Sequence, residues 1–198
     1  MKFIVIGDSI THGQYTNNGE ESPMSLAIPY GDHIRDYLLA DDYVNYGQNG
    51  VSFSKTSPVN GEFAFENVVD NYQKADLIVF MGGTNDFGTN VSLDNFKEAV
   101  RKVFRKLRDN NPDSKIVFIT PIHRKDEDSN GIGLSLLAYK SVLKEESLKH
   151  GFVLLDGYDF KIDAKNEKDR ALYIYDGVHL NDKGQRMLAD FIIEKAGL

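Results

Sequence analysis

Short apolar runs alternate along the chain with longer segments whose hydrophobic positions follow a helical period. Each run is rich in β-branched residues and is followed by Gly, Pro or Asp, a pattern typical of a buried strand. The runs occupy residues 2–6, 43–46, 76–81, 115–120 and 152–155. Because continuous apolar strands that alternate with helices favour a parallel sheet covered on both faces, the pattern predicts a three-layer α/β domain.

Two helices can be placed together with their starting points. One follows Ser92, a candidate N-cap, and ends before Pro112, with apolar residues at positions 93, 96, 100, 103, 104 and 107. The last helix is predicted to begin near residue 181 or 182, with a buried side formed by Met187, Leu188, Phe191 and Ile192. In folds of this kind ligands bind at the carboxyl ends of the strands, so residues that follow the strands are the candidates for chemistry.

Length and composition narrow the class of function. A chain of 198 residues without internal repeats or linkers fits one domain over residues 1–198. The net charge of -7 disfavours nucleic acid and anionic lipid as partners. The absence of cysteine excludes disulfides, thiolate metal ligands and a cysteine nucleophile. The first apolar run is too short for a signal sequence or a membrane span, so we expect a cytoplasmic protein without integral membrane association, unless a leader has been removed.

The two ends of the chain carry groups that suit a serine hydrolase. The motif Gly-Asp-Ser-Ile-Thr at residues 7–11 follows the first apolar run, and Asp-Gly-Val-His at residues 176–179 precedes the last predicted helix. A serine hydroxyl becomes a good nucleophile when an imidazole removes its proton, and the imidazole needs an acid to orient it. The spacing lets the carboxylate of Asp176 reach Nδ1 of His179, which leaves Nε2 to face Ser9. Taken singly, Ser9 could be a helix cap and His179 a packed residue.

Four motifs at strand ends resemble, in content and order, the SGNH subgroup of the GDSL esterase/lipase family over nearly the whole chain. Residues 7–11 are similar to its first block, residues 45–50 to N-x-G-x-x-G, residues 83–86 to G-x-N-D and residues 176–179 to D-x-x-H. The resemblance implies a flavodoxin-like α/β/α sandwich around a central, mostly parallel five-stranded sheet. It also implies the catalytic residues Ser9, Asp176 and His179, and an oxyanion hole formed by Ser9, Gly47 and Asn85. Backbone N–H groups of Ser9 and Gly47 and the side-chain amide of Asn85 would supply three donors to a developing oxyanion.

Three further polar residues lie close to these motifs. Asp8 and Asp86 resemble family positions whose carboxylates fix the adjacent loop through bonds to backbone N–H groups, and we keep both as possible substrate contacts. His12 is a further possible substrate contact and the rival base, because it lies four residues from Asp8 and close to Ser9. It would have to fold back over its own turn to reach the hydroxyl of Ser9.

Polar segments near the strand ends are the candidates for substrate selection. His123 and Arg124 follow the fourth predicted strand and could contact a polar substrate, or they could simply be an exposed basic pair. Residues 14–23, 53–61 and 124–133 are rich in Asn, Ser, Gly, Glu and Asp and would rim a cleft at this edge.

The interpretation favoured by these motifs is a serine esterase that needs no cofactor or metal. The loops are polar and nothing resembles an apolar lid, so we expect a short acyl group, such as acetyl, on a carbohydrate or another small polar alcohol. Lysophospholipase or thioesterase activity on longer chains is the alternative. A two-metal phosphoesterase and a noncatalytic carbohydrate-binding module stay open as other classes, although the histidines of the metallophosphoesterase motifs are missing. The oligomeric state cannot be predicted from the sequence.

Overall fold

The computed structural model describes residues 1–16, 24–56 and 64–198, and its centre is a five-stranded sheet. The strand order is β4-β1-β5-β6-β7, and every neighbouring pair is parallel. The strands are β1 (Lys2–Gly7), β4 (Asp42–Gly47), β5 (Leu77–Met81), β6 (Lys115–Ile119) and β7 (Val153–Leu155). Renumbered along the chain, this is the 2-1-3-4-5 order of flavodoxin-like folds. The predicted α/β fold with a parallel central sheet is confirmed, and the five apolar runs are its strands.

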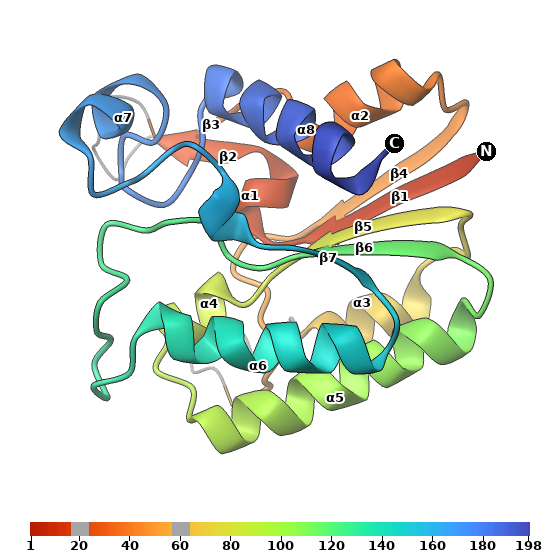
Figure 1. The fold of residues 1–198 in the computed structure, drawn as a ribbon, viewed down its shortest axis with the longest axis horizontal. Helices are drawn as coiled ribbons and strands as arrows, with labels where there is room; N and C mark the ends of the chain where they lie inside the picture. Colours follow the sequence, from red (N-terminus) through yellow and green to blue (C-terminus); the bar gives the residue numbers. More distant parts are fainter. Residues whose placement is uncertain (17–23, 57–63) are drawn as a thin grey trace.

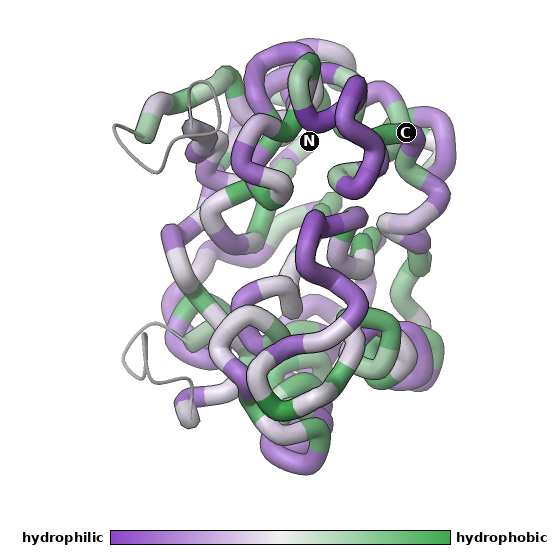
Figure 2. Tube along the Cα trace, turned by 90° about the vertical axis from the view of Figure 1, so that its left-hand side faces the viewer, coloured by the Kyte–Doolittle hydropathy of each residue, from purple (hydrophilic) through white to green (hydrophobic). Residues whose placement is uncertain are grey.

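Helices cover both faces of the sheet (Figure 1). On one face lie α2 (Tyr30–Leu38) and α8 (Asp182–Ala196), and on the other lie α3 (Phe65–Asn71), α5 (Leu93–Asn110) and α6 (Leu136–Lys149). The tube in Figure 2 is coloured by hydropathy and shows hydrophobic and hydrophilic residues interspersed along the described chain. Ser92 is the N-cap of α5, as predicted, and its Oγ accepts from the N–H of Asn95 at 3.4 Å.

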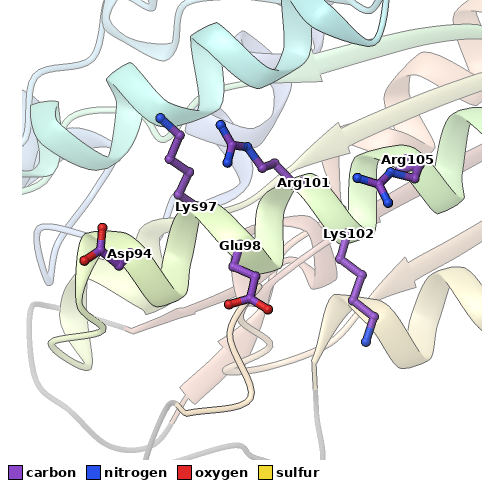
Figure 3. Close-up of a pocket in the computed structure, with 6 residues that line it drawn as sticks. All are labelled: Asp94, Lys97, Glu98, Arg101, Lys102 and Arg105. Carbon is purple, nitrogen blue, oxygen red and sulfur yellow. The ribbon is translucent and has the colours of Figure 1, made fainter.

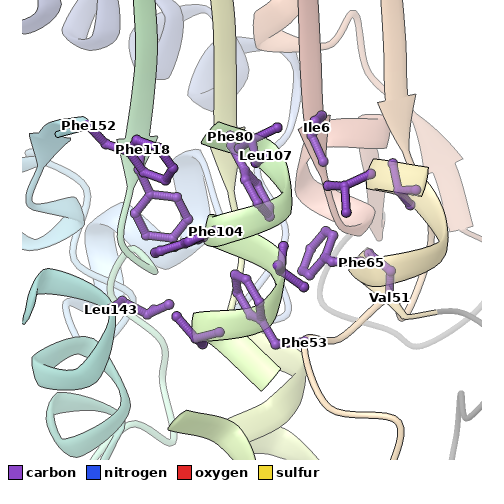
Figure 4. Close-up of a cluster of buried hydrophobic side chains, with 14 of the residues drawn as sticks. Ile6, Val51, Phe53, Phe65, Phe80, Phe104, Leu107, Phe118, Leu143 and Phe152 are labelled. Carbon is purple, nitrogen blue, oxygen red and sulfur yellow. The ribbon is translucent and has the colours of Figure 1, made fainter. Parts of the chain in front are cut away.

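Successive residues of a strand pack into two separate hydrophobic cores, one on each face of the sheet. On β1, Phe3 and Val5 pack under α2 and α8, whereas Ile4 and Ile6 belong to the cluster under α3, α5 and α6. Burial on both faces explains why the strands are continuously apolar in sequence. The cluster under α3, α5 and α6 is rich in phenylalanines. Most of their ring pairs are edge to face or tilted, whereas Phe53 and Phe80 stack. Figure 4 labels Phe53, Phe65, Phe80, Phe104, Phe118 and Phe152.

The last helix begins where the sequence predicts, but its buried side is rotated about the helix axis relative to the predicted one. Asn181 caps α8 by accepting from the N–H of Gly184 at 3.1 Å. Leu188 and Ile192 are fully buried, whereas Met187 and Phe191 are only partly buried. The buried face instead runs through Gly184, Gln185, Leu188, Ala189 and Ile192. Polar Gln185 lies on it because its side chain accepts from the N–H of Tyr30 and donates to the carbonyl of Ile10, a role that hydrophobic periodicity cannot register.

Several short elements complete the described fold. The strands β2 (Gln14–Thr16) and β3 (Met24–Leu26) form an antiparallel pair that the sequence pattern did not predict. The short helices are α1 (Ser9–His12), α4 (Thr84–Gly88), α7 (Glu167–Leu172) and the 3₁₀ helix η1 (Gly157–Asp159). In the part of the chain that the structure describes, no helix is long and apolar enough to span a membrane. Helices α1 and α4 follow neighbouring strands directly, so their first turns meet at one edge of the sheet.

Candidate active site

Ser9 is held at the carboxyl end of β1 by a tight turn into helix α1. The carboxylate of Asp8 caps this helix by accepting from the N–H of Ile10 at 3.0 Å. Gly7 makes the turn possible, because a Cβ there would lie 1.9 Å from Oγ1 of Thr11. Ser9 is the first residue of the helix, a position whose N–H has no partner within the helix. The turn therefore places a hydroxyl and a backbone donor of one residue at the sheet edge.

His179 and Asp176 reach Ser9 from the other end of the chain. Nε2 of His179 lies 2.8 Å from Oγ of Ser9, and Nδ1 lies 2.7 Å from Oδ2 of Asp176. The other carboxylate oxygen of Asp176 accepts the N–H groups of Val178 and His179 at 2.8 and 2.7 Å. Burial tends to raise the pKa of Asp176, but the hydrogen bonds from His179 and Val178 outweigh it and hold the pKa below its usual value. A continuous hydrogen-bonded chain thus joins the three residues that the sequence motifs selected.

Asn85 lies at the same edge of the sheet. Strand β5 pairs with β1 so that Met81 is opposite Gly7, and Asn85 is the second residue of helix α4, which follows β5. Its Nδ2 donates to the carbonyl of Val51 at 2.8 Å. An amide nitrogen carries two hydrogens, so this bond orients the side chain and leaves a second donor for a ligand.

The structure does not support Gly47 as a donor to an oxyanion. Its N–H donates to Oδ1 of Asn45 at 2.8 Å. The same Asn45 side chain donates through Nδ2 to the carbonyl of Thr11 at 2.9 Å and so ties α1 to β4. A Cβ at position 47 would lie 2.5 Å from the backbone nitrogen of His12. Gly47 is therefore explained by the close packing of α1. Asn85 instead bonds to Val51, just after this motif, and the N–H of Val51 closes a turn on the carbonyl of Gln48.

Asp8 and Asp86 use their carboxylates inside the protein. Asp86 is 0% exposed, and its two oxygens accept the N–H groups of Phe53 and Ser54, each at 2.9 Å. It therefore holds the segment that follows β4, rather than only its own loop. Burial raises the pKa of Asp86 to about 7 despite these two bonds, and it raises the pKa of Asp8 to about 6. Because both carboxylates are buried and accept backbone N–H groups, the structure does not favour Asp8 or Asp86 as a substrate contact.

Replacement of Asp86 by asparagine is expected to change how stability depends on pH. Because the pKa of Asp86 in the folded protein lies above the ordinary value of 3.8, the folded state binds the proton more tightly than the unfolded state. Its contribution to stability is therefore lost as pH rises from about 4 to about 7, at up to about 1.4 kcal/mol per pH unit. Urea unfolding of both proteins between pH 4 and pH 8 measures the effect. The free energy of unfolding of the wild type should fall relative to Asp86→Asn over this range, and a constant difference would refute the prediction.

Of the remaining candidate residues, His123 and Arg124 bind partners within the protein, whereas the side chain of His12 is exposed. His12 is exposed on α1, and the hydroxyl of Ser9 bonds to His179 instead. Nδ1 of His123 lies 3.1 Å from the carboxylate of Glu127, and its ring stacks on Tyr158 with centroids 3.8 Å apart. Arg124 is 9% exposed, so it is not part of an exposed basic pair. Of the loops proposed for substrate selection, residues 17–23 and 57–61 lie outside the described residues.

A groove of about 550 Å³ lies along helix α5, away from these residues (Figure 3). It is lined by charged side chains: Asp94, Lys97, Glu98, Arg101, Lys102 and Arg105. Arg101 pairs with Glu146 at 2.9 Å and Lys102 with Glu66 at 2.8 Å. The groove is therefore a solvated surface of ion pairs, separate from the Ser9 site.

The residues considered for a metal centre are used in other ways. Over residues 1–16, 24–56 and 64–198, no group of three or more histidine, aspartate or glutamate side chains is arranged to hold a metal ion. Asp8 and Asp86 bind backbone N–H groups, and Asp176 binds His179.

A serine, a histidine and an aspartate are thus hydrogen-bonded in series at the carboxyl edge of the sheet of an α/β fold, an arrangement in which an imidazole can take the proton of a serine hydroxyl. The chain belongs to the GDSL-like lipase/acylhydrolase family, which matches residues 5–187. The predicted SGNH/GDSL resemblance is thereby confirmed, and carboxylic ester hydrolase is the enzyme class of this family.

Individual proteins are similar to this chain in sequence or in fold. The chain is 26% identical to a multidomain esterase from Ruminococcus flavefaciens, over 98% of this chain and 28% of that protein. It therefore spans little more than a quarter of that relative. An inhibitor-bound aryl esterase from M. smegmatis has the same fold, with a TM-score of 0.76, 14% identity and coverage of 99% of this chain and 98% of that chain. A catalytic mutant of an acetylxylan esterase from Geobacillus stearothermophilus has a TM-score of 0.66 at 21% identity, with coverage of 100% and 94%.

Proposed function

We propose that the protein is a serine esterase that acts through an acyl-enzyme on Ser9, with His179 as general base and acid and Asp176 as the residue that orients it. The observation that supports this proposal is the unbroken series of hydrogen bonds from Oγ of Ser9 through the ring of His179 to Asp176, 2.8 and 2.7 Å long. Membership of an acylhydrolase family supports the same chemistry.

In the first half of the reaction, Nε2 of His179 takes the hydroxyl proton while Oγ of Ser9 attacks the ester carbonyl. The imidazolium that forms lies 2.7 Å from the carboxylate of Asp176, which stabilises its charge. His179 then gives the proton to the departing alcohol, and an acyl group stays on Ser9. In the second half, His179 takes a proton from water as the water attacks the acyl group. His179 then returns that proton to Oγ of Ser9 as the acyl–oxygen bond breaks and the acid leaves. These steps require no metal or cofactor.

Two donors are proposed for the oxyanion of the tetrahedral intermediate. One is the N–H of Ser9, which as the first residue of α1 has no partner within the helix. The other is the second hydrogen on Nδ2 of Asn85, because the first is committed to Val51. Gly47 is left out of the proposed oxyanion hole, since its N–H already donates to Asn45.

The proposed substrate is a short-chain ester, such as an acetyl ester, of a carbohydrate or another small polar alcohol. The segments that follow the predicted strands in sequence are polar, and this composition suits a hydrophilic substrate. The acetylxylan esterase named above is a precedent for such a substrate on this fold.

A chain-length series of p-nitrophenyl esters tests this function. We expect kcat/KM to be highest for acetate or propionate and to fall steadily toward octanoate, because a site for short acyl groups has no long apolar channel. The series is measured with and without EDTA, with the Ser9→Ala protein as the blank. A maximum at eight or more carbons would instead favour lysophospholipase or thioesterase activity. Loss of activity with EDTA would favour the metal-dependent alternative.

A further inference from the structure

Arg124 lies directly against the helix that carries Asn85. It follows strand β6 and extends its guanidinium toward the first residue of α4, where Nη1 donates to both the carbonyl and Oγ1 of Thr84, each at 2.9 Å. The central carbon of the guanidinium lies 5.1 Å from the centre of the Phe87 ring. Arg124 thus contacts α4 on both sides of Asn85 in sequence.

The guanidinium is itself fixed on its other side. Nε and Nη2 donate to the two carboxylate oxygens of Asp126 at 2.8 and 2.9 Å, a bidentate pair that defines the plane of the group. The backbone N–H of Arg124 donates to Glu127 at 3.1 Å. Because the side chain is 9% exposed and its donors face Thr84 and Asp126, it acts within the protein rather than on a substrate.

The next residue contacts the turn that carries the proposed base. The N–H of Lys125 donates to the carbonyl of Gly177 at 3.0 Å, between Asp176 and His179 in sequence. Gly177 has a φ of +81°, and a Cβ there would lie 2.5 Å from Cβ of Lys125. One short segment after β6 therefore contacts both the helix of Asn85 and the turn of His179.

We infer that Arg124 is a positioning residue, which holds helix α4 so that the amide of Asn85 points at the oxyanion. This inference rests on the proposed function, in which Asn85 is an oxyanion donor. Donors of this kind act only when they are held within a fraction of an ångström of the developing charge, and a misplacement of about 1 Å can lower the rate by about 100-fold. A lysine cannot replace the arginine, because it lacks the planar fork that binds Thr84 and Asp126 together.

The test is a double-mutant cycle between Arg124→Met and Asn85→Ala, with p-nitrophenyl acetate as the substrate. In the wild-type background, Arg124→Met is expected to lower kcat by about 10-fold to 100-fold while KM changes by less than about threefold. In the Asn85→Ala background, the same change should lower kcat by less than about twofold, because the group that Arg124 positions is already absent. Arg124→Lys should behave like Arg124→Met in both backgrounds, and it carries the test if the Met variant does not fold.

Arg108→Met is the matched control. The guanidinium of Arg108 also binds backbone carbonyls, those of Asn111 and His150 at 3.1 and 3.0 Å, and lies 5.3 Å from the Phe152 ring, but it is near the amino ends of the strands. The Arg108→Met substitution should lower the melting temperature of the protein without lowering kcat.

Three results would overturn the inference: an equal loss of kcat in both backgrounds, no loss in the wild-type background, or full activity in Arg124→Lys. Failure of the proposed function is recognised separately, because the Ser9→Ala protein would then retain the wild-type rate in the same assay.

Discussion

Replacement of Ser9 by alanine is expected to lower kcat for p-nitrophenyl acetate by about 10⁶-fold while the protein stays folded. The change removes the proposed nucleophile, and in the proposed mechanism no acyl-enzyme can form without it. The backbone N–H of residue 9 and the amide of Asn85 remain, so the rate left over measures binding and oxyanion stabilisation alone. Steady-state kinetics, with the wild-type burst of p-nitrophenol as an active-site titration, give the measurement.

Comparison of Ser9→Ala, His179→Ala and the double variant that combines them shows whether the two residues act as one catalytic unit or independently. His179→Ala should reduce kcat about as much as Ser9→Ala, and the combination should be no worse than either alone, because both groups serve one proton transfer. Ser147→Ala is the matched control: Ser147 is buried at the end of α6 that leads into β7, and its hydroxyl donates to the carbonyl of Leu143. Retention of a tenth of the wild-type rate by Ser9→Ala would refute the serine mechanism.

The fold could be predicted because burial on both faces leaves a direct record in sequence. The five strands read as continuous apolar runs, since residues such as Ile4 and Val5 face different cores and both are fully buried. The rotation of α8 escaped prediction because Gln185 is buried through hydrogen bonds to Tyr30 and Ile10, partners more than 150 residues away in the chain. Hydrophobic periodicity indicates which apolar residues are buried, but it does not indicate which polar residues are buried with a hydrogen-bond partner.

The candidate site also contains residues that the sequence predicts and residues that it does not. Ser9, His179 and Asp176 could be selected because their motifs follow strand ends or precede a helix, and parallel strands bring such positions to one edge. Asn45 was missed as a residue that ties α1 to β4, although an Asn two residues before Gly47 is a typical partner for that N–H. The role of Arg124 could not be predicted, because nothing local indicates that its partner is Thr84, 40 residues earlier. Short motifs identify reactive groups, whereas the residues that hold those groups are defined by tertiary contacts.

Replacement of Asp176 by asparagine is expected to lower kcat by about 10⁴-fold with little change in KM. The amide oxygen of the new side chain would take the place of Oδ1 and still accept from the N–H groups of Val178 and His179, so the turn should be kept. The other carboxylate oxygen would become an NH₂ group that donates to Nδ1 of His179. The imidazole would then carry its proton on Nε2, the atom that must accept from Ser9, and it would be in the wrong tautomer for catalysis.

Asp163→Asn is the matched control for this change, because Oδ1 of Asp163 accepts the N–H of Lys165 at 2.8 Å in a similar local turn without contact to a histidine. It should keep the wild-type kcat. Both variants are measured with p-nitrophenyl acetate, and the protonation of His179 is followed by ¹⁵N NMR. In the wild type the proton should be on Nδ1 and in Asp176→Asn on Nε2, and the shift of the proton should accompany the loss of rate. If Asp176→Asn kept a tenth or more of the wild-type kcat, Asp176 would not be the residue that orients His179, and the orienting acid would have to be sought elsewhere at this edge of the sheet.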